Sequence, residues 1–310
     1  MLLGGVNLYA APANGVEDIP GGKKYTLTNA SSDEEKRAAF KDKDAVIIDV
    51  TGVTDIDPTL TSANPNCIII ANAGTLATSQ NVCVNGVIAS LVLEDMLEDR
   101  YPFACPAGVK ATVAQYSRRQ PNAFGTICLP FDVSDTDVEY YTTNGVRSSD
   151  GALLLSKLTT LPAGTPAIVY NYNHEKSPYY MLNNKAGSEL AAAADHSDGN
   201  GVKMVGSFVD KTINVTQGDN YYGISNNQFV KVTETLNVKP FRAYLTSTTP
   251  LAKLRLQIDD EETLAIQTLT SEGNAVSAIY NANGVRQQGL QKGLNIVKMQ
   301  NGQNMKVYVK

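Results

Sequence analysis

Residues 45–93 read AVIIDVTGVTDIDPTLTSANPNCIIIANAGTLATSQNVCVNGVIASLVL. Four short apolar runs stand out in this stretch, at residues 45–50, 67–71, 82–87 and 91–93, and Asn, Gly, Pro and Thr separate them. Their β-branched residues predict short strands. Runs that recur every ~10 to 20 residues suit the rungs of a small solenoid, in which each strand stacks on the next. A plain antiparallel sheet fits the same pattern, so both architectures stay open.

Helix signal is scarce in this chain. The sequence SDEEKRAAFK at residues 32–41 predicts one short helix, because Ser32 can cap it and Glu35 completes a capping box. An Ala-rich run at residues 189–194 is soon interrupted by polar residues and glycine. We therefore expect residues 25–104 to form a region of short β-rungs with one helix.

The pattern changes near residue 106, where strand signals become longer and more numerous. About eight strands with turn signals between them predict a β-sandwich over residues 105–258, with a barrel as the related architecture. Leu254, Leu256 and Ile258 alternate with polar residues and mark the last strand. The other expected strands are residues 111–116, 125–133, 138–143, 152–158, 166–172, 203–208, 228–232 and 241–245.

Composition limits the classes of function. The chain has 310 residues, 43% of them apolar and 18% charged, with a formal net charge of −5. The apolar content is enough for packed cores, and the low charge is typical of turn-rich β-proteins. A negative chain without a basic stripe argues against nucleic acid as a partner, and no apolar run approaches the ~20 residues of a membrane span. Residues 1–24 form an N-terminal segment that is either a leader remnant or a strand.

The sequence predicts a separate module at the C-terminal end of the chain. Four consecutive carboxylates at residues 259–262 repel one another and resist burial, which predicts an acidic linker over residues 259–270. An acidic loop inside a single domain is the alternative. Beyond it, Asn283-Gly284 and Asn301-Gly302 each lie between apolar runs, and Asn-Gly favours the type I′ turn of a β-hairpin. We expect a small C-terminal β-hairpin module over residues 271–310.

No pattern in the chain predicts an active site or a cofactor. His174 and His196 lie in polar, loop-like stretches, and no nucleophile-elbow, zinc-protease, phosphate-loop or dinucleotide motif is present. Asp135, Asp137 and Glu139 would share one face of a strand, as a glycosidase pair might require, but an exposed acidic strand edge explains them better. We therefore expect a protein that is not an enzyme.

Metal binding is not expected either. The loop at residues 195–201 is rich in oxygen ligands but lacks the spacing and the distal glutamate of a calcium loop. The cysteines form no CxxC pair, and most lie in or beside apolar runs, which favours buried thiols over disulfides without deciding their redox state. They are Cys67, Cys83, Cys105 and Cys128.

A cluster of Tyr and Asn residues between positions 170 and 184 is the candidate binding site. Aromatic rings and amide groups can pack on sugars or partner loops and hydrogen-bond to them. Tyr is also a good strand residue that packs half-buried, which is the structural alternative. The candidate ligand-binding residues are Tyr170, Tyr172, Tyr179, Tyr180 and Asn173, with Asn171 and Asn184 beside them.

Several segments resemble surface and secreted proteins of the Bacteroides and Prevotella type. In the body of the chain these are NPNCIIIANAG at 64–74, NVCVNG at 81–86, SLVL at 90–93, FGTICLPF at 124–131, LPAGTP at 161–166 and PFRAYL at 240–245. The tail is similar to the C-terminal sorting region of the type IX secretion route, through IY at 279–280, NG at 283–284, KGLNIV at 292–297 and KVYVK at 306–310.

The resemblance covers roughly residues 25–310 and is most specific in the tail. It implies export, with an extracellular or outer-surface location, adhesion-like roles beside leucine-rich-repeat-like regions, and contact between the tail and the secretion machinery. We therefore expect a binding or adhesion protein whose partner is a glycan or a host or surface protein. A glycan-binding accessory module of a carbohydrate-active enzyme and a structural cell-envelope component are the alternatives.

Overall fold

The computed structural model describes residues 15–96, 101–135, 137–147, 152–184, 187–199, 201–225, 227–248, 250, 253–258, 276–281, 283–287, 289–299 and 304–309. Within these ranges the chain is mainly β, which confirms the predicted fold class. The strands form a nine-stranded sheet, a ten-stranded sheet, a two-stranded ribbon and a four-stranded sheet.

The helix α1 spans Asp33–Lys41 and begins as its sequence predicts. The Ser32 hydroxyl accepts a hydrogen bond from the Glu35 backbone N–H at 3.2 Å, and the Glu35 carboxylate accepts one from the Ser32 N–H at 2.7 Å. This capping box satisfies two of the N–H groups that a helix leaves unpaired. The Ala-rich run at 189–194 forms no helix, because only Ser188–Glu189 is regular there, as the short strand β13.

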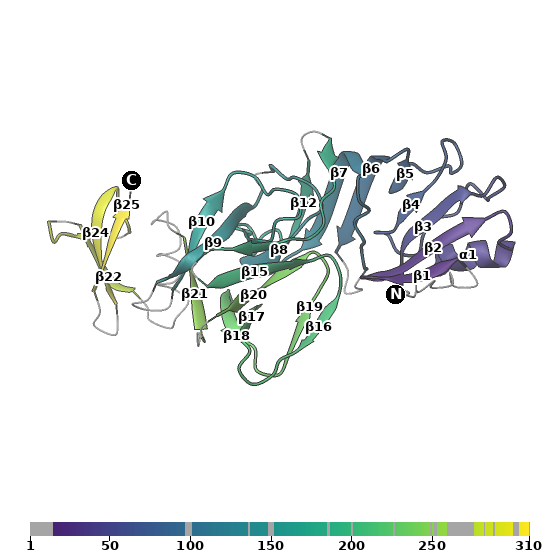
Figure 1. Ribbon diagram of the computed structural model, residues 1–310. Coiled ribbons are helices and arrows are strands. Elements are labelled where there is room, and N and C mark those ends of the chain that lie inside the picture. Colours follow the sequence, from purple (N-terminus) through teal and green to yellow (C-terminus); the bar gives the residue numbers. More distant parts are fainter. Residues whose placement is uncertain are drawn as a thin grey trace.

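The nine-stranded sheet, here called the rung sheet, decides between the two architectures left open by the sequence. Its central strands β2 to β5 run parallel to one another, as in a solenoid (Figure 1). Residues 16–24, part of the expected N-terminal segment, lie in β1 and at the start of β2. The first strands are β1 (Val16–Ile19), β2 (Gly22–Thr28), β3 (Ala45–Gly52), β4 (Ile68–Ile70) and β5 (Val82–Val84).

Buried asparagines hold the rungs together. Asn64, Asn66 and Asn81 are each at most 4% exposed. The Asn64 side-chain amide donates to the Ala45 carbonyl at 2.8 Å. The Asn81 amide donates to the Val92 carbonyl at 2.9 Å and accepts from the Val92 N–H at 2.7 Å. These side chains satisfy backbone groups that the turns between short parallel strands would leave buried and unpaired.

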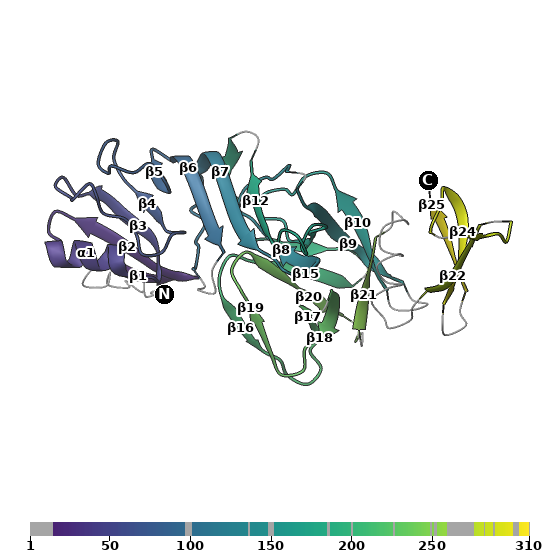
Figure 2. The same ribbon diagram turned by 180° about the vertical axis from the view of Figure 1, so that it is seen from behind.

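A hairpin at Asn85-Gly86 ends the run of parallel strands. Both residues have positive φ, 51° and 78°, which is the geometry of a type I′ turn. The next strand, β6, then pairs in parallel with β7, and β12 adds antiparallel at the edge (Figure 2). The sheet therefore continues across the expected boundary between residues 104 and 105. These strands are β6 (Val87–Asp95), β7 (Lys110–Arg119) and β12 (Tyr179–Asn183).

The ten-stranded sheet, here called the barrel sheet, curls until its strand β8 meets β20. The Cys128 N–H donates to the Phe241 carbonyl at 3.2 Å, and the Thr126 hydroxyl exchanges two hydrogen bonds with the Ala243 backbone. The strands are β8 (Phe124–Ile127), β9 (Glu139–Arg147), β10 (Ala152–Leu158), β11 (Ala167–Tyr170), β14 (Asp195–Ser197), β15 (Val202–Ser207), β17 (Tyr221–Ser225), β18 (Gln228–Lys231), β20 (Arg242–Ser247) and β21 (Lys253–Ile258).

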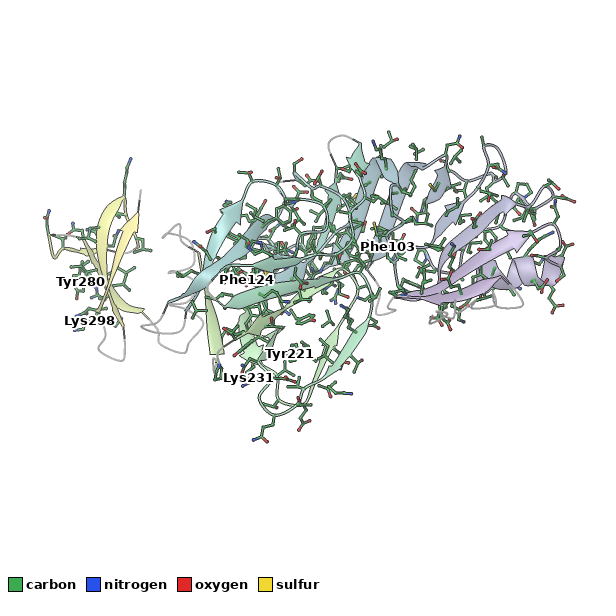
Figure 3. All side chains as sticks on the ribbon, in the orientation of Figure 1. Phe103, Phe124, Tyr221, Lys231, Tyr280 and Lys298 are labelled. Atoms are coloured by element: carbon green, nitrogen blue, oxygen red, sulfur yellow. The ribbon has the colours of Figure 1, made fainter. Side chains whose placement is uncertain are left out.

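Three larger apolar cores follow from this arrangement, and one of them, which includes Phe40 of α1 and Ile48 of β3, belongs to the first strands of the rung sheet. The second lines the inside of the barrel sheet and includes Phe124 and Phe229. The third lies between the barrel sheet and one face of the rung sheet, and Phe103 contributes to it (Figure 3). Its ring lies 5.7 Å from that of Phe208 and 5.8 Å from that of Phe241. The ribbon of β16 (Lys211–Asn214) and β19 (Thr235–Val238) packs on the barrel sheet through a small apolar cluster that includes Leu236, Val238 and Tyr244.

The tail forms its own four-stranded sheet, with strand order β23-β22-β24-β25. Its first turn differs from the expected type I′ geometry. The Asn281 N–H donates to Val285 and the Gly284 N–H donates to Asn281, a longer loop in which Gly284 takes a positive φ of 78°. Asn301-Gly302 and the acidic linker lie outside the described residues. The strands are β22 (Val276–Asn281), β23 (Arg286–Gln287), β24 (Gly293–Met299) and β25 (Asn304–Val309).

Candidate functional site

The structure divides the predicted Tyr cluster into buried and exposed residues. Tyr170 is 4% exposed and stacks on Phe124 with ring centroids 4.7 Å apart. Tyr180 is also buried, and its hydroxyl donates to the Gln120 side chain at 3.2 Å. Both rings belong to the apolar cores, so the prediction that they contact a ligand is wrong for these two residues.

Tyr172 and Tyr179 are exposed, at 53% and 51%. The turn between them is built around the buried Asn171. The Asn171 side-chain amide donates to the Ser177 carbonyl at 3.2 Å and accepts from the Asn173 N–H at 3.1 Å. Asn173 is exposed, as a residue that contacts a ligand must be. These hydrogen bonds fix the segment that carries the two exposed rings.

Tyr179 lies on β12 opposite Arg119 of β7. The Arg119 guanidinium carbon is 5.9 Å from the centroid of the Tyr179 ring, within cation–π range. Two residues further along the same face, Met181 is 46% exposed. The exposed residues of the predicted cluster therefore lie beside Arg119 of β7, and Tyr170 and Tyr180 are not among them.

The acidic residues considered for glycoside hydrolysis have structural partners. Strand β9 begins at Glu139, so the three carboxylates do not share one strand face. Glu139 binds Lys157 at 2.6 Å and accepts a hydrogen bond from Tyr141. Burial opposes ionisation of Glu139, but these two partners outweigh it and lower its pKa. Asp135 accepts two hydrogen bonds from Asn183, at 3.0 and 3.1 Å.

The loop that loosely resembled a calcium site forms a hairpin between β14 and β15. Asp195 pairs with Lys203 at 2.9 Å, and Asp198 accepts a hydrogen bond from the Val202 N–H at 3.2 Å. In the part of the chain that the structure describes, no group of His, Cys, Asp or Glu residues is arranged to hold a metal ion.

All four cysteines are free thiols, and three of them are buried. Burial raises the pKa of Cys67 and Cys128 to about 12, and that of the half-buried Cys105 to about 11. A thiol needs its thiolate form to act as a nucleophile or a metal ligand. At neutral pH these thiols therefore behave as small apolar side chains, as the sequence predicts for buried cysteines.

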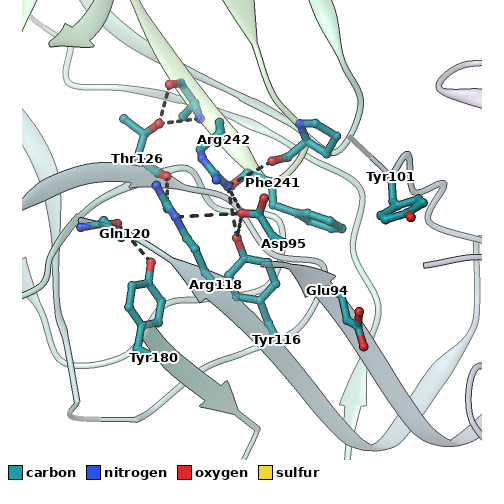
Figure 4. A network of polar contacts seen from close by, with 12 residues as sticks. Glu94, Asp95, Tyr101, Tyr116, Arg118, Gln120, Thr126, Tyr180, Phe241 and Arg242 are labelled. Atoms are coloured by element: carbon teal, nitrogen blue, oxygen red, sulfur yellow. Dashed lines mark hydrogen bonds and ion pairs between the residues drawn. The ribbon is translucent and has the colours of Figure 1, made fainter. Parts of the chain in front are cut away.

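Sequence reasoning missed a buried ionic network, here called the Asp95 network, between the rung sheet and the barrel sheet (Figure 4). Asp95 at the end of β6 contacts Arg242 of β20 at 2.5 Å, and it accepts a hydrogen bond from the Tyr116 hydroxyl at 2.5 Å. Arg118 of β7 lies 4.0 Å from the same carboxylate oxygen. The side chains of Asp95, Tyr116, Arg118 and Arg242 are each at most 15% exposed.

The network contains two guanidinium groups and one carboxylate. Carbonyl oxygens stabilise the additional positive charge: Arg118 donates to Thr126 at 2.8 Å and Arg242 to Pro240 at 3.2 Å. Burial raises the pKa of Tyr116 far above its usual value, and the neighbouring Asp95 adds to this, so its hydroxyl stays protonated as a donor. The network thereby ties β6 and β7 to β8 and β20.

Comparison of the chain with protein-family models, with curated proteins and with solved structures gave no match. No helix in the described part of the chain has the length and the apolar character needed to cross a lipid bilayer.

Proposed function

We propose that this protein is an exported or cell-surface binding protein without catalytic activity. The observation that supports the proposal most is the pair of exposed rings, Tyr172 and Tyr179, on a hydrogen-bonded turn and an edge strand. Exposed aromatic side chains held by a rigid scaffold are a common feature of binding surfaces, because little conformational entropy is lost when they are covered.

The surroundings of these rings are consistent with a scaffold rather than a reaction centre. The two carboxylates considered for glycoside hydrolysis, Asp135 and Glu139, are held by Asn183 and by Lys157. The Asp95 network joins the rung sheet and the barrel sheet, so that the binding surface rests on one continuous body. The partner that we propose is a glycan or a host or surface protein.

We propose that the C-terminal sheet acts as the sorting signal for secretion. Its strands β22 to β25 form a sheet of their own, and their sequence is the part of the chain that most resembles a type IX sorting region. A separate sheet suits a signal that the secretion machinery reads without unfolding the body.

Binding of the full-length protein to arrays of glycans and of surface proteins tests the proposed function. We expect binding that the double substitution Tyr172→Ala and Tyr179→Ala abolishes. Val230→Ala, which truncates an exposed side chain on β18, is the matched control and should leave binding unchanged. Equal binding by the double variant and by the natural sequence contradicts the proposal that Tyr172 and Tyr179 form the binding surface. Glycan hydrolysis that is lost in Asp135→Asn or Glu139→Gln contradicts the absence of catalysis.

A further inference from the structure

We propose that the outer face of β6, β7 and β12 binds a neutral glycan chain, with a sugar ring stacked on Tyr179. The outer face is defined by Glu94 of β6, Gln115 and Arg119 of β7, and Tyr179, Met181 and Asn183 of β12. This inference rests on the proposed function and specifies its partner.

Strand register places these side chains on one surface. Tyr179 is paired with Arg119, and Asn183 with Gln115, so both pairs point to the same side of the sheet. Ser117, which is paired with Met181, is also the partner of Glu94 on β6. Figure 4 is consistent with this register, because the Glu94 side chain points away from the Asp95 side chain and from the residues of the Asp95 network.

Tyr179 supplies an aromatic surface that a cation–π contact helps to orient before a ligand arrives. The Arg119 guanidinium lies 5.9 Å from the ring centroid, and the ring keeps half of its surface open to solvent. The apolar C–H face of a sugar packs on such a ring in the same way as other apolar groups do. Because the ring is already held, less side-chain entropy is lost on binding.

Amide groups next to the ring provide hydrogen bonding for sugar hydroxyls. The Gln115 amide donates to the Asn183 side-chain oxygen at 3.2 Å, and the Asn183 amide donates to Asp135 at 3.1 Å. This chain of hydrogen bonds holds the Gln115 and Asn183 side chains in place beside Met181. An apolar platform flanked by oriented polar groups is the usual chemistry of a small-ligand site.

The charges on the face favour a neutral ligand. Glu94 and Arg119 contribute one negative and one positive charge, which cancel. The Asp135 carboxylate that holds Asn183 adds one further negative charge, and the whole chain is negative by 5 at pH 7. A polyanion such as a uronic acid polymer would be repelled by this net charge rather than attracted.

The size of the face argues against a protein partner. Three strands ~4.8 Å apart are about 14 Å wide, and the five residues of β7 from Gln115 to Arg119 span about 16 Å, which gives roughly 220 Å². A stable protein–protein interface buries ~800 Å² on each partner. A narrow chain molecule fits the available area better.

The edge of β12 is also poorly suited to adding a peptide strand. The Asn183 N–H donates to the Asp135 carboxylate at 3.0 Å, and the Tyr179 carbonyl accepts from the Ser177 hydroxyl at 3.0 Å. These two side chains cap backbone groups that an added strand would need for pairing. We therefore place the ligand on the face of the sheet rather than at its edge.

Affinity electrophoresis of the full-length protein in gels containing a β-glucan, a mannan or a galactan tests this inference, with polygalacturonate as the acidic comparison. We expect retardation by at least one neutral polymer. Tyr179→Ala should weaken that affinity about tenfold, whereas Tyr179→Phe, which keeps the ring, should stay within about threefold. Val230→Ala is the control for a truncated exposed side chain and should match the natural sequence.

The inference is overturned if no neutral polymer is bound, if only polygalacturonate is bound, or if Tyr179→Ala binds neutral polymer as well as the natural sequence does. Loss of binding to a surface protein in the Tyr172 and Tyr179 double variant, without neutral-glycan binding, overturns the inference and leaves the proposed function standing. If the protein binds neither glycans nor surface proteins, both the inference and the proposed function are contradicted.

Discussion

Replacement of Asp95 by Asn tests the importance of the Asp95 network. The substitution keeps the side-chain shape but removes the only carboxylate that contacts both Arg242 and Tyr116 in the described structure. Removing one partner of a buried ion pair costs ~3–5 kcal/mol, because the remaining charges stay buried without compensation. This is a large part of the ~5–15 kcal/mol that stabilises a typical folded domain. We expect the midpoint of thermal unfolding to fall by about 10 °C.

Near-ultraviolet circular dichroism suits the measurement, because the chain contains 15 Tyr and no Trp. Asp195→Asn is the matched control: it breaks an ion pair whose side chains are 45% and 47% exposed, and such surface pairs contribute only ~0–1 kcal/mol. Tyr116→Phe should fall between the two, since it removes the hydrogen bonds that the hydroxyl donates to Asp95 and accepts from Arg242, together worth ~1–3 kcal/mol, but leaves the Asp95–Arg242 ion pair in place. If Asp95→Asn lowers the midpoint no more than Asp195→Asn does, the reasoning is refuted.

Three further predictions concern other parts of the body. Asn81→Ala should destabilise the rung sheet by ~2–4 kcal/mol in urea unfolding, because the Val92 backbone groups lose both hydrogen bonds; a cost below 1 kcal/mol would contradict this. Gly125→Ala should cost ~1–3 kcal/mol, because a Cβ there would lie 2.6 Å from Gln120 Oε1 and 2.8 Å from Arg118 Nη2; unchanged stability would show that these side chains can move. Because its partners lower the Glu139 pKa, this residue stabilises the fold above the ordinary carboxyl pKa, and the contribution is lost as pH falls through the lowered value. Lys157→Ala should therefore flatten the pH dependence of unfolding as pH falls below the ordinary carboxyl pKa, and an unchanged slope would argue against the ion pair.

Local signals in the sequence predicted much of the fold. Ser32 and Glu35 form the expected capping box because both partners lie within four residues of each other. The apolar runs became strands, although the one expected over residues 125–133 ends at Ile127, shortly before Pro130, which has no backbone N–H to donate. Whether neighbouring strands pair in parallel or antiparallel was not predictable, because the sequence of an apolar run does not specify its pairing partner.

The candidate site was half predictable. Alternation along a strand could have separated Tyr179 from Tyr180, because adjacent residues point to opposite faces. The Asp95 network could not be found in this way, because Asp95 and Arg242 are far apart in sequence and follow no period. Residues 124–131 and 240–245 supply Thr126 and Arg242 to this network, so these two segments have a structural role.

The most direct test of the proposed role concerns the C-terminal sheet. The full-length chain and a chain truncated after Thr270 should be expressed behind the same leader in a bacterium that uses the type IX route, and both should be assayed in the cell fractions and in the medium. We predict that the full-length protein reaches the outer surface or the medium and that the truncated chain stays in the periplasm with its body folded. Equal amounts of both chains in the same compartment would contradict the proposal that the C-terminal sheet is a sorting signal.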